Sequence, residues 1–224
     1  MIRLTSLTCA LVLLSSSAFA AEQPSSVVEL FTSQGCSSCP PVNNFVNELA
    51  SDDDKLILTY GVTYWDYLGW KDTFGDPKFT QRQKYYGKAL QSANIYTPQI
   101  VLNGSTHSPR YTREDVEEMV MPDTQPSASL YLEEGALMLA SEAPADSKVF
   151  LVSYTPGEQT VPVKRGENNG RTLALSNVVT DVMPVDWNGS TVSMGVTPED
   201  GAAYAVLIHD AETAEIVSAA TYAP

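Results

Sequence analysis

The sequence predicts an α/β domain followed by an all-β antiparallel sandwich domain. Strand and helix signals alternate before residue 121, whereas only strand signals follow it. Between the two parts lies Met121-Pro122-Asp123-Thr124-Gln125-Pro126, a polar stretch bracketed by prolines, which is typical of a linker. We therefore expect a signal peptide over residues 1–20, the α/β domain over 21–124 and the sandwich over 125–224.

The first twenty residues have the three parts of a secretory signal. Arg3 is the basic start, residues 4–14 are the apolar core, and Ala18-Phe19-Ala20 is a small-residue cleavage site. The apolar core is too short to anchor the mature protein in a bilayer. Acylation of Cys9 is disfavoured because Cys9 lies inside that core. We expect a periplasmic or secreted protein with no stable membrane anchor after cleavage.

The α/β part begins with a strand over residues 27–31. Apolar residues then recur at i, i+3, i+4 and i+7 from Val42 to Leu49, which predicts an amphipathic helix directly after a pair of cysteines. Residues 56–60 form a short apolar run, as in a buried parallel strand. This order of strand, helix and strand is the reason for placing a parallel sheet here.

Three further signals complete the α/β part. Asp76-Pro77 resembles an N-cap followed by proline at the first helical position, ahead of an apolar face from Phe79 to Leu90. Residues 99–102 read as a strand closed by the tight-turn dipeptide Asn103-Gly104. Thr112-Arg113-Glu114-Asp115 has the pattern of a capping box and predicts a last helix.

The second part shows only alternating apolar runs separated by turn dipeptides. The runs are residues 129–132, 136–139, 149–152 and 205–208, and the dipeptides are Glu134-Gly135, Pro156-Gly157, Asn169-Gly170 and Asn188-Gly189. Strands at this spacing with turns between them predict an antiparallel sandwich.

Cys36-Ser37-Ser38-Cys39 is the strongest functional motif. Once residues 1–20 are removed, these are the two remaining cysteines, so they form a single local pair. The free N–H groups and the dipole at a helix start favour the thiolate of Cys36, which is the attacking species. The motif predicts thiol–disulfide exchange in which Cys36 attacks and Cys39 resolves.

The strand, the Cys-x-x-Cys motif, the helix after it and the later Thr97-Pro98 together resemble the thioredoxin fold. Four segments are similar to a family of secreted bacterial thioredoxin-like proteins of unknown function: residues 27–40, 64–72, 96–99 and 165–173. The resemblance implies an α/β thioredoxin-like domain ahead of the sandwich. It also implies a cis proline at Pro98 beside the cysteines, with the backbone of Thr97 able to pair with an extended substrate.

Three other residues are candidates for supporting roles. Thioredoxins carry a buried acid six residues before the first cysteine, whereas Glu29 lies seven before Cys36. Glu29 is either a proton acceptor for the resolving cysteine or an acid on a solvated strand face. Trp65 and Asp66 lie in an aromatic insertion over residues 64–74, which either walls the cysteine pair and contacts substrate or packs on the sheet.

A polar cluster with glycines at 166 and 170 lies in the second part: Arg165, Glu167, Asn168 and Arg171. It reads as a hairpin tip or a contact between domains, and a ligand-binding loop is the alternative.

Charge limits the class of partner. The chain has 13 basic and 27 acidic residues and a net charge of −14, and loss of Arg3 with the signal makes it −15. This balance disfavours nucleic acid and anionic membranes. We expect a protein or a small thiol or disulfide as the substrate, a redox partner that the sequence does not identify, and no cofactor.

No metal is expected, because His107 and His209 do not form a closely spaced ligand pair for zinc. Two alternatives stay open: a non-catalytic interaction module with a structural disulfide, and copper(I) binding by the two thiolates.

Overall fold

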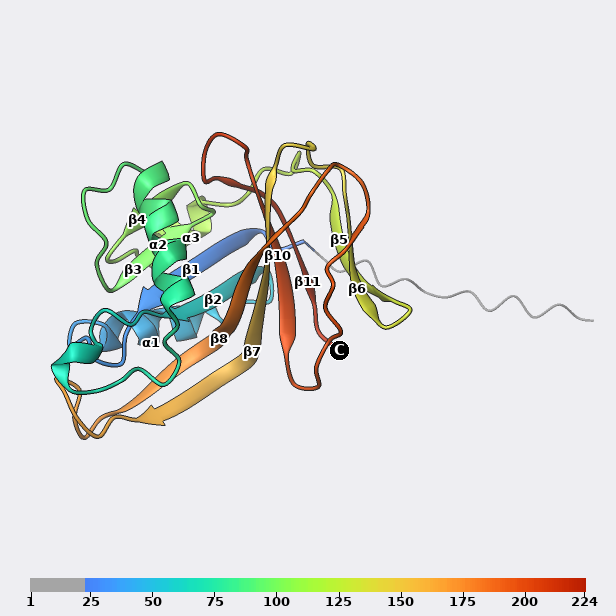
Figure 1. Ribbon diagram of the computed structural model, residues 1–224. Helices are drawn as coiled ribbons and strands as arrows, with labels where there is room; N and C mark the ends of the chain where they lie inside the picture. The colour runs from blue at the N-terminus through green and yellow to red at the C-terminus, as the bar shows by residue number, and fades with distance from the viewer. Residues whose placement is uncertain (1–22) are drawn as a thin grey trace, which may run out of the picture.

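A computed structural model describes residues 23–224, with three α-helices, one 3₁₀ helix and eleven strands in that range (Figure 1). In chain order they are β1 (Ser26–Thr32), α1 (Pro40–Leu49), β2 (Lys55–Gly61), η1 (Asp66–Leu68), α2 (Pro77–Ala89), β3 (Gln99–Leu102), β4 (Thr106–Ser108), α3 (Arg113–Glu118), β5 (Ala128–Glu133), β6 (Ala136–Ser141), β7 (Lys148–Pro162), β8 (Thr172–Val185), β9 (Val192–Ser193), β10 (Ala203–His209) and β11 (Ile216–Tyr222). The predicted signal peptide lies outside the described residues. No helix in the described range is long and apolar enough to cross a membrane.

One mixed sheet of eight strands runs through both halves of the chain. Its order is β11-β10-β7-β8-β2-β1-β3-β4, and a second sheet has the order β5-β6-β9. β1 and β2 are parallel, as the short apolar runs predict. The junction between the halves is the contact of β2 with β8, where Thr59 pairs with Val178 and the Thr59 hydroxyl donates to the carbonyl of Ser176 at 2.7 Å.

The predicted fold class, an α/β thioredoxin-like domain followed by an all-β antiparallel sandwich domain, is therefore wrong. Four strands from the range expected to form a separate sandwich extend the sheet that β1 to β4 begin: β7, β8, β10 and β11. Alternation identifies which residues form a strand, but the partner of a strand is chosen by backbone groups far away in the chain. Whether residues 21–124 and 125–224 fold as separate units stays a prediction.

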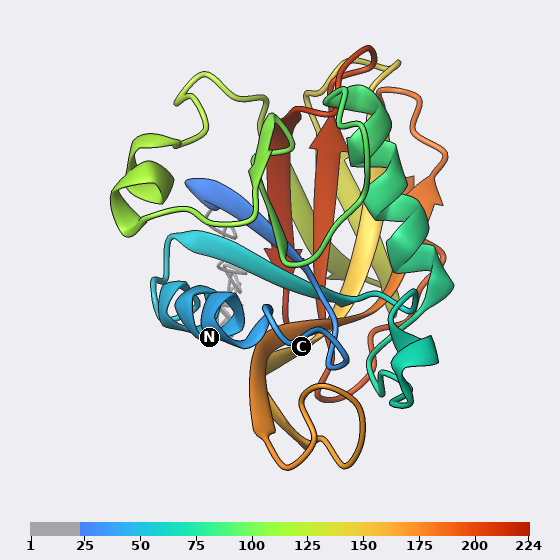
Figure 2. The same cartoon turned by 90° about the vertical axis from the view of Figure 1, so that its left-hand side faces the viewer.

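Side chains from helices and from the small sheet cover both faces of this large sheet. On one face, α2 packs its Phe79 and Tyr86 onto strands from both halves of the chain. On the other face, α1 and α3 cover β1 and β3, while the small sheet covers β7 and β10. Figure 2 shows α2 in green on one side of the sheet and α1 in blue toward the other. Because β1 alternates, Val27 and Phe31 belong to the α2 side, and Val28 and Leu30 to the α1 side.

Local signals located the helices of the first half correctly. Asp76 caps α2 by accepting from the N–H of Lys78 at 2.7 Å, and the capping box of Thr112 and Asp115 starts α3. The Asn103-Gly104 turn is also confirmed: Gly104 has φ +64°, and a Cβ there would overlap the carbonyl oxygen of Ala214. Glycine is the residue that this close approach allows.

The turn predicted at Pro156-Gly157 is wrong. Both residues lie within β7, at a bulge where the register with β8 shifts between Thr155 and Glu158. A bulge and a turn both accept glycine with positive φ, and Gly157 has φ +76°. The real turn of this hairpin lies farther on, around Asn169-Gly170.

Candidate functional site

Cys36 and Cys39 form a disulfide between the end of β1 and the start of α1, with Cα atoms 5.5 Å apart. Cys36 is 4% exposed and Cys39 is 0% exposed, so the sulfur expected to attack is nearly covered. α1 begins at Pro40 with Cys39 as its N-cap residue, which places Cys36 in the preceding turn. Pro40 and Pro41 carry no N–H, so this helix start offers Cys36 fewer donors than the sequence argument assumes.

Gln34 ties the loop before the disulfide to the aromatic insertion. Its backbone N–H donates to Oδ2 of Asp72 at 2.7 Å, and its side-chain Oε1 accepts from Nε1 of Trp70 at 2.8 Å. The side-chain Nε2 donates to the Thr73 hydroxyl at 2.9 Å. Gln34 is buried, so these bonds fix the loop to residues 70–73.

Trp65 lies between this loop and Thr97. Its Nε1 donates to the Thr97 hydroxyl at 2.7 Å, and its Cβ lies 3.4 Å from the place where a Cβ on Gly35 would stand. The Thr97–Pro98 bond is cis, and Pro98 is buried. One half-buried side chain thus connects the cysteine loop to the Thr97-Pro98 pair that the sequence singles out.

Asp66 contacts the backbone of Asp72 within the insertion rather than either cysteine. Its Oδ1 accepts from the N–H of Asp72 at 3.1 Å. Burial raises the pKa of Asp72 to about 6, with a further contribution from the charge of Asp66, against the hydrogen bonds from Gln34 and Phe74 that lower it. Asp72 was not singled out from the sequence, where nothing distinguishes a buried aspartate in a loop from an exposed one.

Glu29 lies on the other face of the sheet from α1. Its carboxylate accepts from Nε and Nη2 of Arg82 at 2.6 and 3.0 Å, and from the hydroxyl of Tyr86. Burial raises the pKa of Glu29, but the charge and hydrogen bonds of Arg82 outweigh burial and lower it overall. The structure therefore brings Glu29 to Arg82 and not to the disulfide. This buried ion pair matches neither of the two settings expected from the sequence, a site beside the cysteines or a solvated strand face.

His209 belongs to the same buried cluster. Its Nε2 lies 3.4 Å from Nη2 of Arg82, and its Nδ1 lies 2.7 Å from the carbonyl oxygen of Ala214. Burial, followed by the charge of Arg82, lowers the pKa of His209 to about 3. The imidazole is neutral at physiological pH and acts as part of the core.

The tip of the β7–β8 hairpin, residues 165–170, reaches the disulfide loop. Nδ2 of Asn168 donates to the carbonyl oxygens of Gln34 at 2.9 Å and Cys36 at 2.8 Å, and Oε2 of Glu167 accepts from the N–H of Ser37 at 3.2 Å. Figure 2 shows this orange tip below the blue loop that leads into α1. The polar cluster noted in the sequence is a hairpin tip, and its contact is with the cysteine motif.

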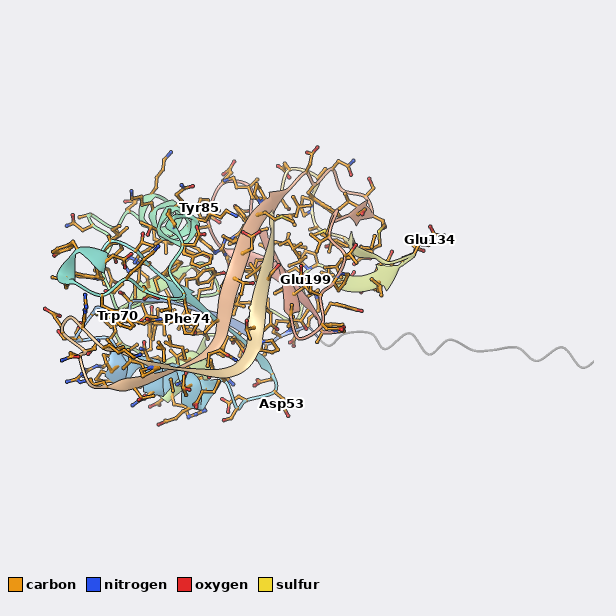
Figure 3. The ribbon with its side chains drawn as sticks, turned by 60° about the horizontal axis from the view of Figure 1, so that its bottom comes forward. Asp53, Trp70, Phe74, Tyr85, Glu134 and Glu199 are labelled. Atoms are coloured by element: carbon orange, nitrogen blue, oxygen red, sulfur yellow. A yellow bond between two sulfur atoms is a disulfide. The ribbon has the colours of Figure 1, made fainter. Side chains whose placement is uncertain are left out.

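The hairpin also packs against the insertion. Val161, Val163 and Leu173 form a small apolar cluster with Trp70 and Phe74, which Figure 3 labels beside the far end of the hairpin. The disulfide loop thus has the insertion on one side and the hairpin tip on another.

Metal ligands are not gathered anywhere in residues 23–224: no group of three or more His, Cys, Asp or Glu side chains is placed to hold an ion. Within that range His107 contacts the hydroxyl of Tyr96, and His209 is buried in the core. Copper(I) binding by the reduced cysteines stays a prediction.

Two solved structures are similar to this chain. Protein AGR_C_4864 from Agrobacterium tumefaciens has 29% sequence identity and a TM-score of 0.70, over 90% of this chain and 95% of its own. HBP35 of Porphyromonas gingivalis has 12% identity and a TM-score of 0.60, over 91% of this chain and 76% of its own, so this likeness concerns the fold alone. No curated protein matches the chain.

A family described as "Protein of unknown function (DUF1223)" matches residues 27–209. The matched range starts in β1 and ends with β10, so it includes the disulfide, the insertion and the β7–β8 hairpin. The chain therefore belongs to the DUF1223 family of proteins of unknown function.

Proposed function

We propose that the Cys36–Cys39 pair carries out thiol–disulfide exchange in a periplasmic or secreted protein. The observation that supports it is the position of the disulfide, in the turn between β1 and α1, with Trp65 joining its loop to Thr97. A cysteine pair before a helix is a common site of reversible oxidation.

The proposed reaction starts from the reduced pair. The thiolate of Cys36 attacks one sulfur of a substrate disulfide, whose S–S bond breaks and releases the first substrate thiolate. Cys39, after losing its proton to solvent or a nearby base, attacks the Cys36 sulfur of the mixed disulfide and releases the second substrate thiolate. The substrate gains two electrons and the pair becomes a disulfide; the reverse sequence oxidises a substrate dithiol.

Cysteine replacement tests this proposal. The reduced protein is mixed with a peptide that contains one disulfide, and the peptide thiols released per protein are counted. We expect Cys36→Ser to abolish release and Cys39→Ser to accumulate a mixed disulfide, because the resolving sulfur is absent. Ser37→Ala is the matched control, since Ser37 is exposed and its replacement leaves both sulfurs in place. Release by Cys36→Ser at the wild-type rate would reject the proposal.

The second candidate is a non-catalytic interaction module in which the disulfide only holds the loop to α1. It is favoured by the burial of both cysteines, which are 4% and 0% exposed. A structural disulfide resists reduction by a glutathione pool, whereas a catalytic one is reduced and alkylated readily. Mass spectrometry after mild glutathione treatment and alkylation separates the two: two added alkyl groups support exchange, and none supports the structural role.

A further inference from the structure

We infer that the β7–β8 hairpin tip is a positioning element for the cysteine pair, with Asn168 as the positioning residue. In this arrangement the docked tip and the Cys36–Cys39 disulfide stabilise each other. The meaning of this coupling for catalysis rests on the proposed function, but the coupling itself is a property of the disulfide equilibrium.

Asn168 is built into the site. It is 0% exposed, and its Nδ2 serves two carbonyl oxygens on either side of Gly35, those of Gln34 and Cys36. Its Oδ1 accepts from Nη1 of Arg171 at 3.0 Å, which orients the amide so that its donors face the loop. The carbonyl groups of Gln34 and Cys36 both accept from this one side chain, and the Cys36 carbonyl also accepts from the N–H of Cys39 at 3.3 Å.

The tip holds its shape through contacts of its own. The N–H of Val163 donates to the carbonyl of Arg171, and the N–H of Gly170 donates back to that of Val163, each at 2.9 Å. Gly166 fits against Trp70, whose Cβ would be 3.4 Å from a Cβ at that position. Asn168 is therefore held by a framework that does not include either cysteine.

Docking of the tip is coupled to disulfide formation because the tip contacts one particular form of the loop. The two Asn168 bonds are made to the loop in its disulfide-bonded form. Holding the Cys36 backbone in that form keeps its sulfur near Cys39, which raises the effective concentration of one thiol at the other. By linkage, a tip that favours the disulfide is in turn held more loosely by the reduced pair.

A glutathione redox titration measures the coupling. Two glutathione thiols reduce the disulfide to two cysteine thiols and leave as one glutathione disulfide, and alkylation with mass spectrometry gives the ratio of the two protein forms. We expect Asn168→Ala to lower the equilibrium constant for disulfide formation about tenfold, equivalent to about 30 mV toward easier reduction. Asn169→Ala is the matched control: Asn169, the neighbour of Asn168, is exposed, and the variant should titrate like the wild type.

A second variant covers the case in which Asn168→Ala fails to fold. Arg171 is exposed and lies outside the loop, so Arg171→Ala should fold while freeing the Asn168 amide, and we expect a shift in the same direction of about threefold. A folded Asn168→Ala protein with the wild-type constant would overturn the inference, as would an Arg171→Ala protein with no shift if Asn168→Ala is unfolded. Loss of peptide reduction in Cys36→Ser bears only on the proposed function, because this titration needs no substrate turnover.

Discussion

The buried pair of Glu29 and Arg82 offers the sharpest test of how this core is held together. Replacing Glu29 by glutamine removes the charge that neutralises Arg82, while the side chain keeps its size. Both side chains are almost fully covered, at 1% and 3% exposure, and Nε lies 2.6 Å from Oε1. Removing one partner of a buried ion pair costs about 3–5 kcal/mol, because the remaining charge stays in the interior.

A pair of equal length at the surface supplies the control. Nζ of Lys78 also lies 2.6 Å from Oδ1 of Asp181, but these side chains are 55% and 41% exposed. Asp181→Asn should therefore cost about 0–1 kcal/mol. The contrast between the two variants separates the effect of burial from that of distance.

Urea unfolding followed by circular dichroism at pH 7 gives both free energies of unfolding. With a slope of about 2–3 kcal/mol per M, the expected loss in Glu29→Gln lowers the midpoint by roughly 1–2.5 M. A Glu29→Gln protein within about 1 kcal/mol of Asp181→Asn would refute the reasoning.

The same variant also tests the function predicted for Glu29. Because Glu29 lies on the face of the sheet away from α1, the folded Glu29→Gln protein should reduce a peptide disulfide at the wild-type rate. Slow exchange by a stable Glu29→Gln protein would instead restore its role as a proton acceptor.

Two further predictions concern the surroundings of the disulfide. Burial raises the pKa of Asp72 from 3.8 to about 6, so its protonated form favours folding; that contribution is complete below pH 3.8 and is lost as the pH rises through about 6. Asp72→Asn removes this titration, so wild-type stability minus variant stability should fall by about 2 kcal/mol between pH 4 and 7 in urea unfolding, and parallel curves would contradict the pKa. Trp65→Phe removes the hydrogen bond to Thr97 and should cost about 0.5–1.5 kcal/mol in the same assay. Tyr67→Phe, at a side chain 76% exposed, should cost nothing measurable, and equal losses in the two would argue against the Trp65 bond.

Elements with short-range signals were predictable. Three helices that the structure confirms are identified by aspartate and proline at 76 and 77, by the capping box at 112–115 and by the apolar spacing from Val42 to Leu49. Each signal acts over one or two turns of backbone, so the neighbouring residues contain the whole cause. The Asn103-Gly104 turn belongs to the same class.

The arrangement of those elements was not predictable in the same way. Nothing within β8 indicates that it pairs with β2. A strand that extends an α/β sheet and a strand of a sandwich show the same apolar alternation in sequence. The predicted fold class failed at this point, because β8 joins the sheet that contains β1 and β2. Pro156-Gly157 likewise predicts a turn, but these residues lie in a bulge of β7. A bulge and a turn favour the same residue types, so the sequence does not separate them.

What the amino-acid order determined by itself is the set of local structures and the cysteine pair between β1 and α1, because propensity, capping and turn chemistry act among neighbours. Only the tertiary structure decided which residues from distant parts of the chain those residues contact. Glu29 meets Arg82 at a separation of 53 residues, and Cys36 meets Asn168 at a separation of 132. Contacts across such distances depend on how sheets and loops pack, because each buried polar group must find a partner wherever the fold brings one.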